Sequence, residues 1–162
     1  MPARFGVVGT GWRAQFYLRL ARLLPTEREV VGIVGHTPDA VELAATRWDL
    51  PAYPSLEDLV ASRRPDFIVS AAPWAVTPVV TQAAVAVEIP ILCETPPAPD
   101  LEGLRSLWQS VGASGLVQVA EQYPLMPSHA SRLALVRRGV KTFIRRDPQV
   151  ATGSSIVLIL IP

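Results

Sequence analysis

The sequence predicts an α/β domain with a doubly wound parallel sheet, and three observations support this prediction. Segments with the character of strands alternate with segments of helical spacing almost throughout the chain, which is typical of parallel sheets. The strand segment Asp66–Ser70 is a near-continuous apolar run, as expected for a strand that is covered on both faces. Six strand segments fall within roughly 120 residues, which is the size of one ordinary domain.

The first strand, the first helix and the turn between them form the most informative segment of the chain. An apolar strand is expected at Phe5–Val8, and apolar residues follow at helical spacing from Phe16 onward. Strand, G-x-G-x-x-A and helix together are the fingerprint of a dinucleotide-binding βαβ unit. The motif consists of Gly9, Thr10, Gly11, Trp12, Arg13 and Ala14.

Each small residue of the motif has a physical role in that unit. Gly9 permits a sharp turn, Gly11 lets the backbone approach a pyrophosphate, and Ala14 lets the helix pack closely on the strand. The helix N-terminus offers its free N–H groups and the positive end of its dipole to the phosphates. A methyltransferase also uses a glycine-rich turn, but it usually carries an acidic residue at the end of the first strand, and Val7-Val8 offers none.

The next elements follow from their apolar residues and their capping residues. A second strand is expected at Val30–Val34, and a helix at Pro38–Trp48 begins with a proline that suits a first helical turn. Tyr53 marks a brief third strand. Ser55 is typical of an N-cap for a helix at Leu56–Ser62, with Asp58 at the capping-box position.

The second half of the predicted sheet continues the same alternation. Its strands are expected at Asp66–Ser70, Ile89–Cys93 and Gly115–Val119. Helices are expected at Val76–Val87, from Leu101 through Trp108 and from about Pro127 to Arg138. Asp100 is a favourable N-cap for the second of these helices, and Gly139 is a favourable C-cap for the third.

The end of the chain has a different character, so we expect a domain boundary between residues 1–122 and 123–162. Thr142–Val150 is charged and is expected to be irregular. Ile156–Ile161 is a run of large apolar residues with high strand propensity. Because a free strand of this kind promotes aggregation, we expect it to pair, either on an edge of its own sheet or with a second chain in a homodimer.

Composition excludes several classes of partner. The chain has 162 residues and a net charge of +1, which gives no reason to expect nucleic acid or an anionic membrane surface as a partner. No apolar stretch is long enough to span a bilayer, no signal peptide is evident, and no metal site is indicated. Cys93 is the single cysteine, so no intramolecular disulfide can form, and we expect a cytoplasmic protein.

Several motifs together resemble those of the glucose–fructose oxidoreductase, inositol dehydrogenase and rhizopine-catabolism (Gfo/Idh/MocA) family. The matching segments are Gly6–Ala14, Ala71-Ala72-Pro73, Leu92-Cys93-Glu94-Thr95-Pro96, Gln122-Tyr123-Pro124 and Arg137-Arg138-Gly139-Val140. The resemblance implies an NAD(P)-dependent oxidoreductase that acts on a sugar or polyol and has a second α/β domain. It covers residues 3 to about 140, so the chain is similar to the first domain and the start of the second. A truncated or frame-shifted product is one interpretation of so short a chain.

Three departures from the family pattern bear on activity. Thr95 stands where the family usually has the lysine of a Glu-Lys-Pro motif, and threonine is no proton carrier near pH 7. Gly35-His36-Thr37 lacks the acidic residue that often holds the ribose in NAD enzymes. The catalytic Asp and His of the family's second domain have no place in this chain. An alternative function is therefore a non-catalytic nucleotide-binding or protein-interaction module.

The candidate site combines the fingerprint with three later loops. We expect NADP or NAD as the cofactor, and the motif residues Gly9–Ala14 as its phosphate site. His36 with the nearby Arg13 is one indication of a 2′-phosphate site, and the alternative is a solvated loop histidine and a surface arginine. The remaining candidates for cofactor binding are Thr37, Ala72, Pro73, Trp74 and Glu94. The catalytic residues stay unassigned.

Overall fold

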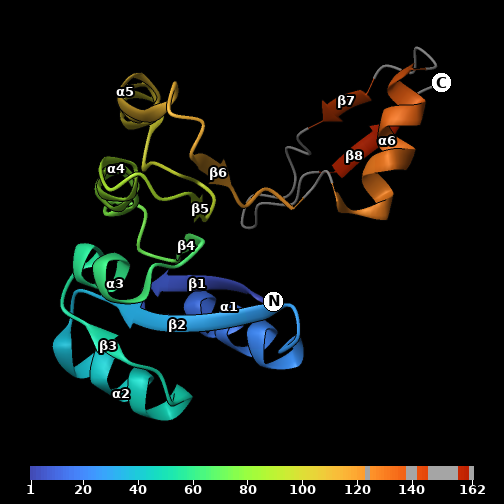
Figure 1. The fold of residues 1–162 in the computed structure, drawn as a ribbon. Helices are drawn as coiled ribbons and strands as arrows, with labels where there is room; N and C mark the ends of the chain where they lie inside the picture. Colours follow the sequence, from blue (N-terminus) through green and yellow to red (C-terminus); the bar gives the residue numbers. More distant parts are fainter. Residues whose placement is uncertain (123–124, 138–141, 146–156, 161–162) are drawn as a thin grey trace. The chain divides into compact units, whose positions relative to one another are not determined.

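The computed structural model of the chain describes residues 1–122, 125–137, 142–145 and 157–160 (Figure 1). Contacts between residues divide the chain into two compact units, Met1–Ala120 and Glu121–Pro162.

The first unit is built on a six-stranded parallel sheet with the order β3-β2-β1-β4-β5-β6. The order reverses between β1 and β4, which creates a switch point at the carboxyl ends of these two strands. The predicted fold class is therefore confirmed, and each predicted strand is present within two residues at either end. The strands are β1 (Ala3–Val8), β2 (Arg28–Val34), β3 (Ala52–Tyr53), β4 (Phe67–Ser70), β5 (Ile91–Cys93) and β6 (Val117–Val119).

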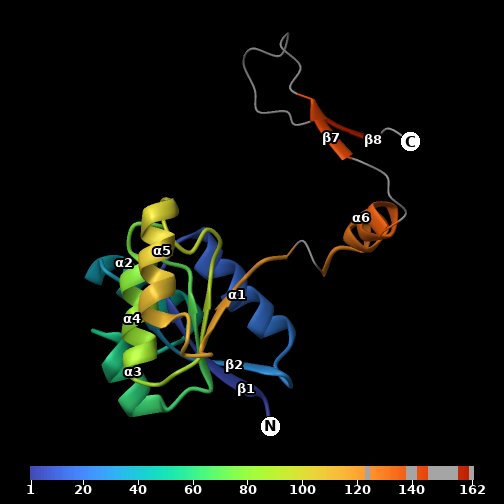
Figure 2. The same cartoon turned by 90° about the horizontal axis from the view of Figure 1, so that it is seen from above.

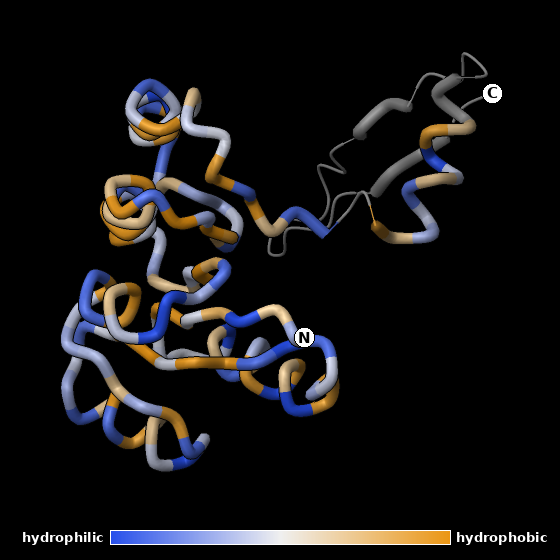
Figure 3. The backbone as a smooth tube through the Cα atoms, viewed as in Figure 1, coloured by the Kyte–Doolittle hydropathy of each residue, from blue (hydrophilic) through white to orange (hydrophobic). Residues whose placement is uncertain are grey.

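Five helices cover the two faces of this sheet, and Figure 2 shows α1 and α4 on opposite sides of it. Neighbouring strand residues point to opposite faces. Val69 therefore packs in the apolar cluster with α1 and α2, while Ile68 packs in the cluster with α3 and α4. The helices alternate between hydrophobic and hydrophilic positions along their turns (Figure 3). They are α1 (Trp12–Leu23), α2 (Pro38–Trp48), α3 (Leu56–Arg63), α4 (Thr77–Ala86) and α5 (Leu101–Val111).

The capping residues predicted from the sequence act as expected at two helices. The Ser55 hydroxyl accepts a hydrogen bond of 3.0 Å from the Asp58 N–H at the start of α3. The Asp100 carboxylate accepts one of 2.7 Å from the Gly103 N–H at the start of α5. Each bond satisfies an N–H group that has no partner within the helix.

The second unit contains α6 (Pro127–Arg137) and an antiparallel pair of strands, β7 (Thr142–Arg145) and β8 (Val157–Leu160). The expectation of irregular structure is wrong for Thr142–Arg145, because its β-branched and aromatic residues form a strand despite the charges around it. The apolar tail is paired as expected, but its partner is β7 in a separate two-stranded sheet. Three parts of the predictions lie outside the described residues: the C-cap Gly139, residues 146–150 of the segment expected to be irregular, and residues 156 and 161 at the ends of the apolar run.

Within the described residues, no helix is both long enough and apolar enough to cross a bilayer.

Candidate functional site

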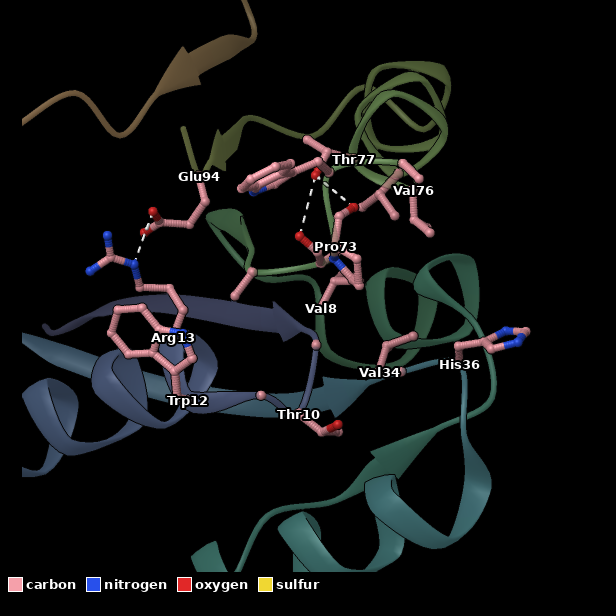
Figure 4. A pocket seen from close by; sticks show the side chains of 18 of the residues that line it. Val8, Thr10, Trp12, Arg13, Val34, His36, Pro73, Val76, Thr77 and Glu94 are labelled. Atoms are coloured by element: carbon pink, nitrogen blue, oxygen red, sulfur yellow. Dashed lines mark hydrogen bonds and ion pairs between the residues drawn. The ribbon is translucent and has the colours of Figure 1, made fainter. Parts of the chain in front are cut away.

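A cavity of about 1180 Å³ opens at the carboxyl ends of β1, β2 and β4, at the switch point of the sheet (Figure 4). This is the place where open α/β sheets bind their ligands. Four segments line it, namely the β1–α1 turn, the end of β2, the β4–α4 loop and the end of β5. The lining residues are Val8–Arg13, Val34–Thr37, Ala71–Thr77, Val80, Glu94 and Thr95.

The two glycines of the fingerprint differ in whether the fold itself requires glycine at that position. Gly9 has φ +122°, and a Cβ atom there would lie 2.7 Å from the Ala71 carbonyl oxygen, so both the backbone and the space demand glycine. Gly11 has an ordinary extended conformation, and a Cβ atom there would meet nothing within 4 Å. Glycine at position 11 is therefore required by neither backbone nor packing, and its absent side chain leaves open space in the cavity. Ala14, in the first turn of α1, is fully buried in an apolar cluster with residues of the sheet.

The helices that begin at the cavity have no side-chain caps. Gly11, Thr37 and Val76 are the N-caps of α1, α2 and α4, all three line the cavity, and none makes a capping hydrogen bond through its side chain. In contrast, the N-caps of α3 and α5 do so, and they lie outside the cavity lining. No acidic residue occupies the first turn of α1, so its free N–H groups and dipole favour an anion in the cavity.

Glu94 follows β5, and α1 engages its carboxylate from two positions. Its Oε2 atom lies 3.0 Å from Arg13 Nε, and its Oε1 atom accepts a hydrogen bond of 2.5 Å from the Tyr17 hydroxyl. Burial raises the pKa of Tyr17, and the hydrogen bond to the Glu94 carboxylate raises it further, so the phenol stays protonated. The Arg13 guanidinium also lies 4.8 Å from the centre of the Trp12 ring.

The structure separates two residues that the sequence interpretation had placed together. Arg13 is paired with Glu94, whereas His36 lies at the other end of the cavity (Figure 4). Arg13 therefore gives no support to a 2′-phosphate site. His36 and Thr37 are exposed where β2 ends, and no carboxylate lines the cavity there.

The β4–α4 loop is held by a residue that the sequence interpretation missed. Thr77 is buried, and its hydroxyl donates to the carbonyl oxygens of Ala72, at 3.4 Å, and Pro73, at 3.3 Å. A threonine that follows a proline-containing loop and begins a helix was the available signal. Trp74, from the same loop, is 62% exposed and faces the cavity as one of its lining residues.

Every residue proposed for cofactor binding lines this cavity, with the exception of Ala14, which is buried in the apolar core. Thr95 also lines it, at the place where the family resemblance puts a lysine. Cys93 is buried in the core, and burial raises the pKa of its thiol, so it takes no part in the site. Among the described residues, no group of three histidine, cysteine or acidic side chains is placed to hold a metal ion.

The fold and the cavity define a dinucleotide-binding α/β domain of the Rossmann type. Residues 3–122 match the family model described as "Oxidoreductase family, NAD-binding Rossmann fold", so the chain belongs to the Gfo/Idh/MocA oxidoreductase family. The family assignment from the sequence motifs is thereby confirmed, and NAD-type dinucleotides are the cofactors of this family. No curated protein sequence matches the chain.

Solved structures with the same fold include three dehydrogenases and reductases of low sequence identity. The WlbA dehydrogenase from Bordetella pertussis, in complex with NADH and UDP-GlcNAcA, has 20% identity and a TM-score of 0.74 over 92% of this chain and 48% of its own. Myo-inositol 2-dehydrogenase from Lactobacillus plantarum has 18% identity and a TM-score of 0.71 over 86% of this chain and 42% of its own. Biliverdin reductase from Synechocystis sp. PCC 6803, in complex with biliverdin and NADP+, has 21% identity and a TM-score of 0.69 over 88% of this chain and 45% of its own. The chain thus spans less than half the length of these proteins.

Proposed function

We propose that this chain binds NADP or NAD in the cavity at the switch point and is the cofactor-binding part of an oxidoreductase. The observation that carries this proposal is the open space above Gly11 beside the uncapped N-terminus of α1. In this arrangement the pyrophosphate lies over Gly9–Ala14, the adenosine lies toward His36, and the nicotinamide lies toward Glu94 and Thr95. When bound, the dinucleotide supplies hydride transfer, while the chain contributes its position and electrostatics.

The proposal is tested by titrating the chain with NADPH and following the nicotinamide fluorescence. The expected result is a saturable increase in NADPH fluorescence, which an excess of the non-fluorescent NADP+ reverses by competition. If neither NADPH nor NADH gives a saturable signal, the chain is not a dinucleotide-binding domain.

NADP is expected to bind at least as tightly as NAD. The end of β2 presents exposed His36 and Thr37 to the cavity and no carboxylate that would repel a 2′-phosphate or accept a bond from a 2′-hydroxyl. Calorimetric titrations of both cofactors, side by side, check this expectation. A clear preference for NAD would contradict it.

His36→Asp provides the matched variant for this prediction. The new carboxylate is expected to weaken NADP binding by about tenfold or more, equivalent to about 1.4 kcal/mol, and to leave NAD binding unchanged or improved. Asp39→Asn serves as the control, because Asp39 is exposed on the first turn of α2 and does not line the cavity. Equal losses for both cofactors in His36→Asp would place the 2′-phosphate elsewhere.

The substrate class proposed for the oxidoreductase is a sugar or polyol, which rests on the family resemblance. Among the similar structures, one is an inositol dehydrogenase, one is in complex with a nucleotide sugar, and a third is in complex with biliverdin. The alternative is a non-catalytic nucleotide-binding or protein-interaction module, and Thr95 at the cavity favours it. We further propose a cytoplasmic location, and a domain boundary near residue 122 with residues 123–162 belonging to a second domain.

A homodimer through the apolar C-terminal strand remains a separate proposal. The strand β8 pairs with β7 on one edge, so its other edge is free to pair with a second chain within the described two-stranded sheet. Light scattering should give a dimer mass for the full chain and a monomer mass after Leu158→Lys, which places a charge in the strand. A monomer mass for the unaltered chain would contradict the proposal.

A further inference from the structure

The side chain of Glu94 joins two segments of the cavity wall that are far apart in the sequence. Its carboxylate contacts Arg13 and Tyr17 on α1, and it is itself the residue that follows β5. The Glu94 side chain is 12% exposed and the Arg13 side chain 32% exposed, so water screens their interaction only in part. An ion pair that is partly shielded from water is stronger than one on an open surface.

The same contact extends to the aromatic side chain at the cavity mouth. Trp12 is 75% exposed and lines the cavity, so its ring has few packing contacts to hold it in one position. The Arg13 guanidinium lies 4.8 Å from the centre of that ring, at a distance typical of a cation–π contact. Glu94 thus contacts Arg13, and Arg13 in turn contacts the Trp12 ring (Figure 4).

We propose that Glu94 is a positioning residue, which ties the end of β5 to α1 through Tyr17 and Arg13 and thereby fixes the Trp12 ring at the nicotinamide end of the cavity. These four residues are called the Glu94 cluster. The inference deepens the proposed dinucleotide site and rests on it. It assigns Glu94 to the arrangement of the wall, since both of its carboxylate oxygens already have partners on α1.

The raised pKa of Tyr17 agrees with this arrangement. Burial is the main cause and the hydrogen bond to Glu94 the second, while the positive charge of Arg13 acts in the opposite direction and the nearby Cys93 adds a small increase. The phenol is thus a permanent donor at physiological pH. Tyr17→Phe removes this donor and leaves the ring in place.

The first measurement examines the ligand-free protein. The chain has four tryptophans, which can be labelled as 5-fluorotryptophan, and Trp12→Phe assigns the ¹⁹F resonance of Trp12. Glu94→Gln and Tyr17→Phe are expected to shift this resonance. Two matched controls are expected to leave it unchanged: Glu42→Gln, an exposed acid on α2, and Tyr53→Phe, whose hydroxyl accepts a hydrogen bond from Arg63.

The second measurement is a double-mutant cycle on NADPH affinity. Glu94→Gln and Arg13→Met are each expected to weaken binding by about three- to tenfold, and the double variant to weaken it no further, because the residues act as one unit. Arg13→Lys keeps a positive charge beside Glu94 but loses the planar guanidinium over the Trp12 ring, so its affinity is expected to lie between that of the unaltered chain and that of Arg13→Met.

The outcomes separate this inference from the proposed function. Losses that add in the double variant would mean that Glu94 and Arg13 contact the dinucleotide independently, and tighter binding by Glu94→Gln would mean that Glu94 withholds Arg13 from the phosphates. Either result overturns the positioning role, as does an unshifted Trp12 resonance in Glu94→Gln. If the unaltered chain does not bind NADPH, the proposed function is wrong, and so is the predicted effect of the Glu94 and Arg13 substitutions on NADPH affinity.

Discussion

Gly11→Val is expected to abolish dinucleotide binding while the domain remains folded. The backbone at Gly11 has φ −70° and ψ −176°, which any residue adopts, and a Cβ atom there has no neighbour within 4 Å. Valine is therefore compatible with the fold. Its side chain would nevertheless fill the space beside the N-terminus of α1 where the pyrophosphate is proposed to lie.

The expected loss is large because the phosphates would be kept away from the N–H groups of the helix. A hydrogen bond to a charged group contributes about 1.5–3 kcal/mol, so the loss of two corresponds to an affinity roughly 100-fold lower or worse. Calorimetry with NADPH measures the affinity, and circular dichroism with thermal unfolding checks the fold. Unchanged affinity in a folded Gly11→Val variant would contradict the proposed phosphate site.

Gly9→Ala is the control for this experiment, because it is expected to lower the stability of the fold, whereas Gly11→Val is expected to block binding alone. Its positive φ and the 2.7 Å approach of a Cβ atom to the Ala71 carbonyl oxygen strain the fold itself. Such backbone strain costs roughly 1–3 kcal/mol of unfolding free energy. The two neighbouring glycines thus separate a loss of binding from a loss of stability.

The second large effect concerns catalysis, since the chain is expected to bind the cofactor without oxidising a sugar or polyol at an enzymatic rate. Among the described residues that line the cavity, the titratable side chains are Arg13, His36 and Glu94. A guanidinium is no proton carrier, His36 lies at the proposed adenosine end, and Glu94 is engaged by α1. Thr95 stands where the family resemblance places a lysine.

The missing proton carrier alone corresponds to about 10²–10⁴-fold in rate. NADPH formation at 340 nm, with a panel of polyols and with the cofactor at saturation, measures any turnover. A parallel NADPH titration checks that the cofactor site of the same preparation is intact. Turnover near the median of about 10 s⁻¹ for ordinary enzymes would refute the non-catalytic interpretation.

The fold was largely predictable because its signals are local. Apolar runs, the fingerprint glycines and the N-caps Ser55 and Asp100 each act within a few residues, and the structure confirms the strands and helices that they indicate. The strand at Thr142–Arg145 was missed because its pairing with Val157–Leu160 depends on residues far along the chain. Charges nearby concealed its strand propensity.

The candidate site was predictable as a set of segments, and less so as a set of contacts. The sheet topology brings the carboxyl ends of parallel strands together, so the loops after β1, β2, β4 and β5 meet at one cavity. Which side chains touch within it depends on three-dimensional detail. Tyr17 carried no motif, and the signal at Thr77 was only its place at the start of a helix. The pairing of Arg13 with Glu94 links residues whose spacing in the sequence gives no hint of contact.

The proposed dinucleotide site can be examined directly in a crystal structure of the chain with NADPH. The predicted result is a dinucleotide in the cavity of the switch point, with its pyrophosphate at the N–H groups of Gly11, Trp12 and Arg13. Its adenosine should lie toward His36, and its nicotinamide toward Glu94 and Thr95. Density for the dinucleotide outside this cavity, or with the two ends reversed, would contradict the account.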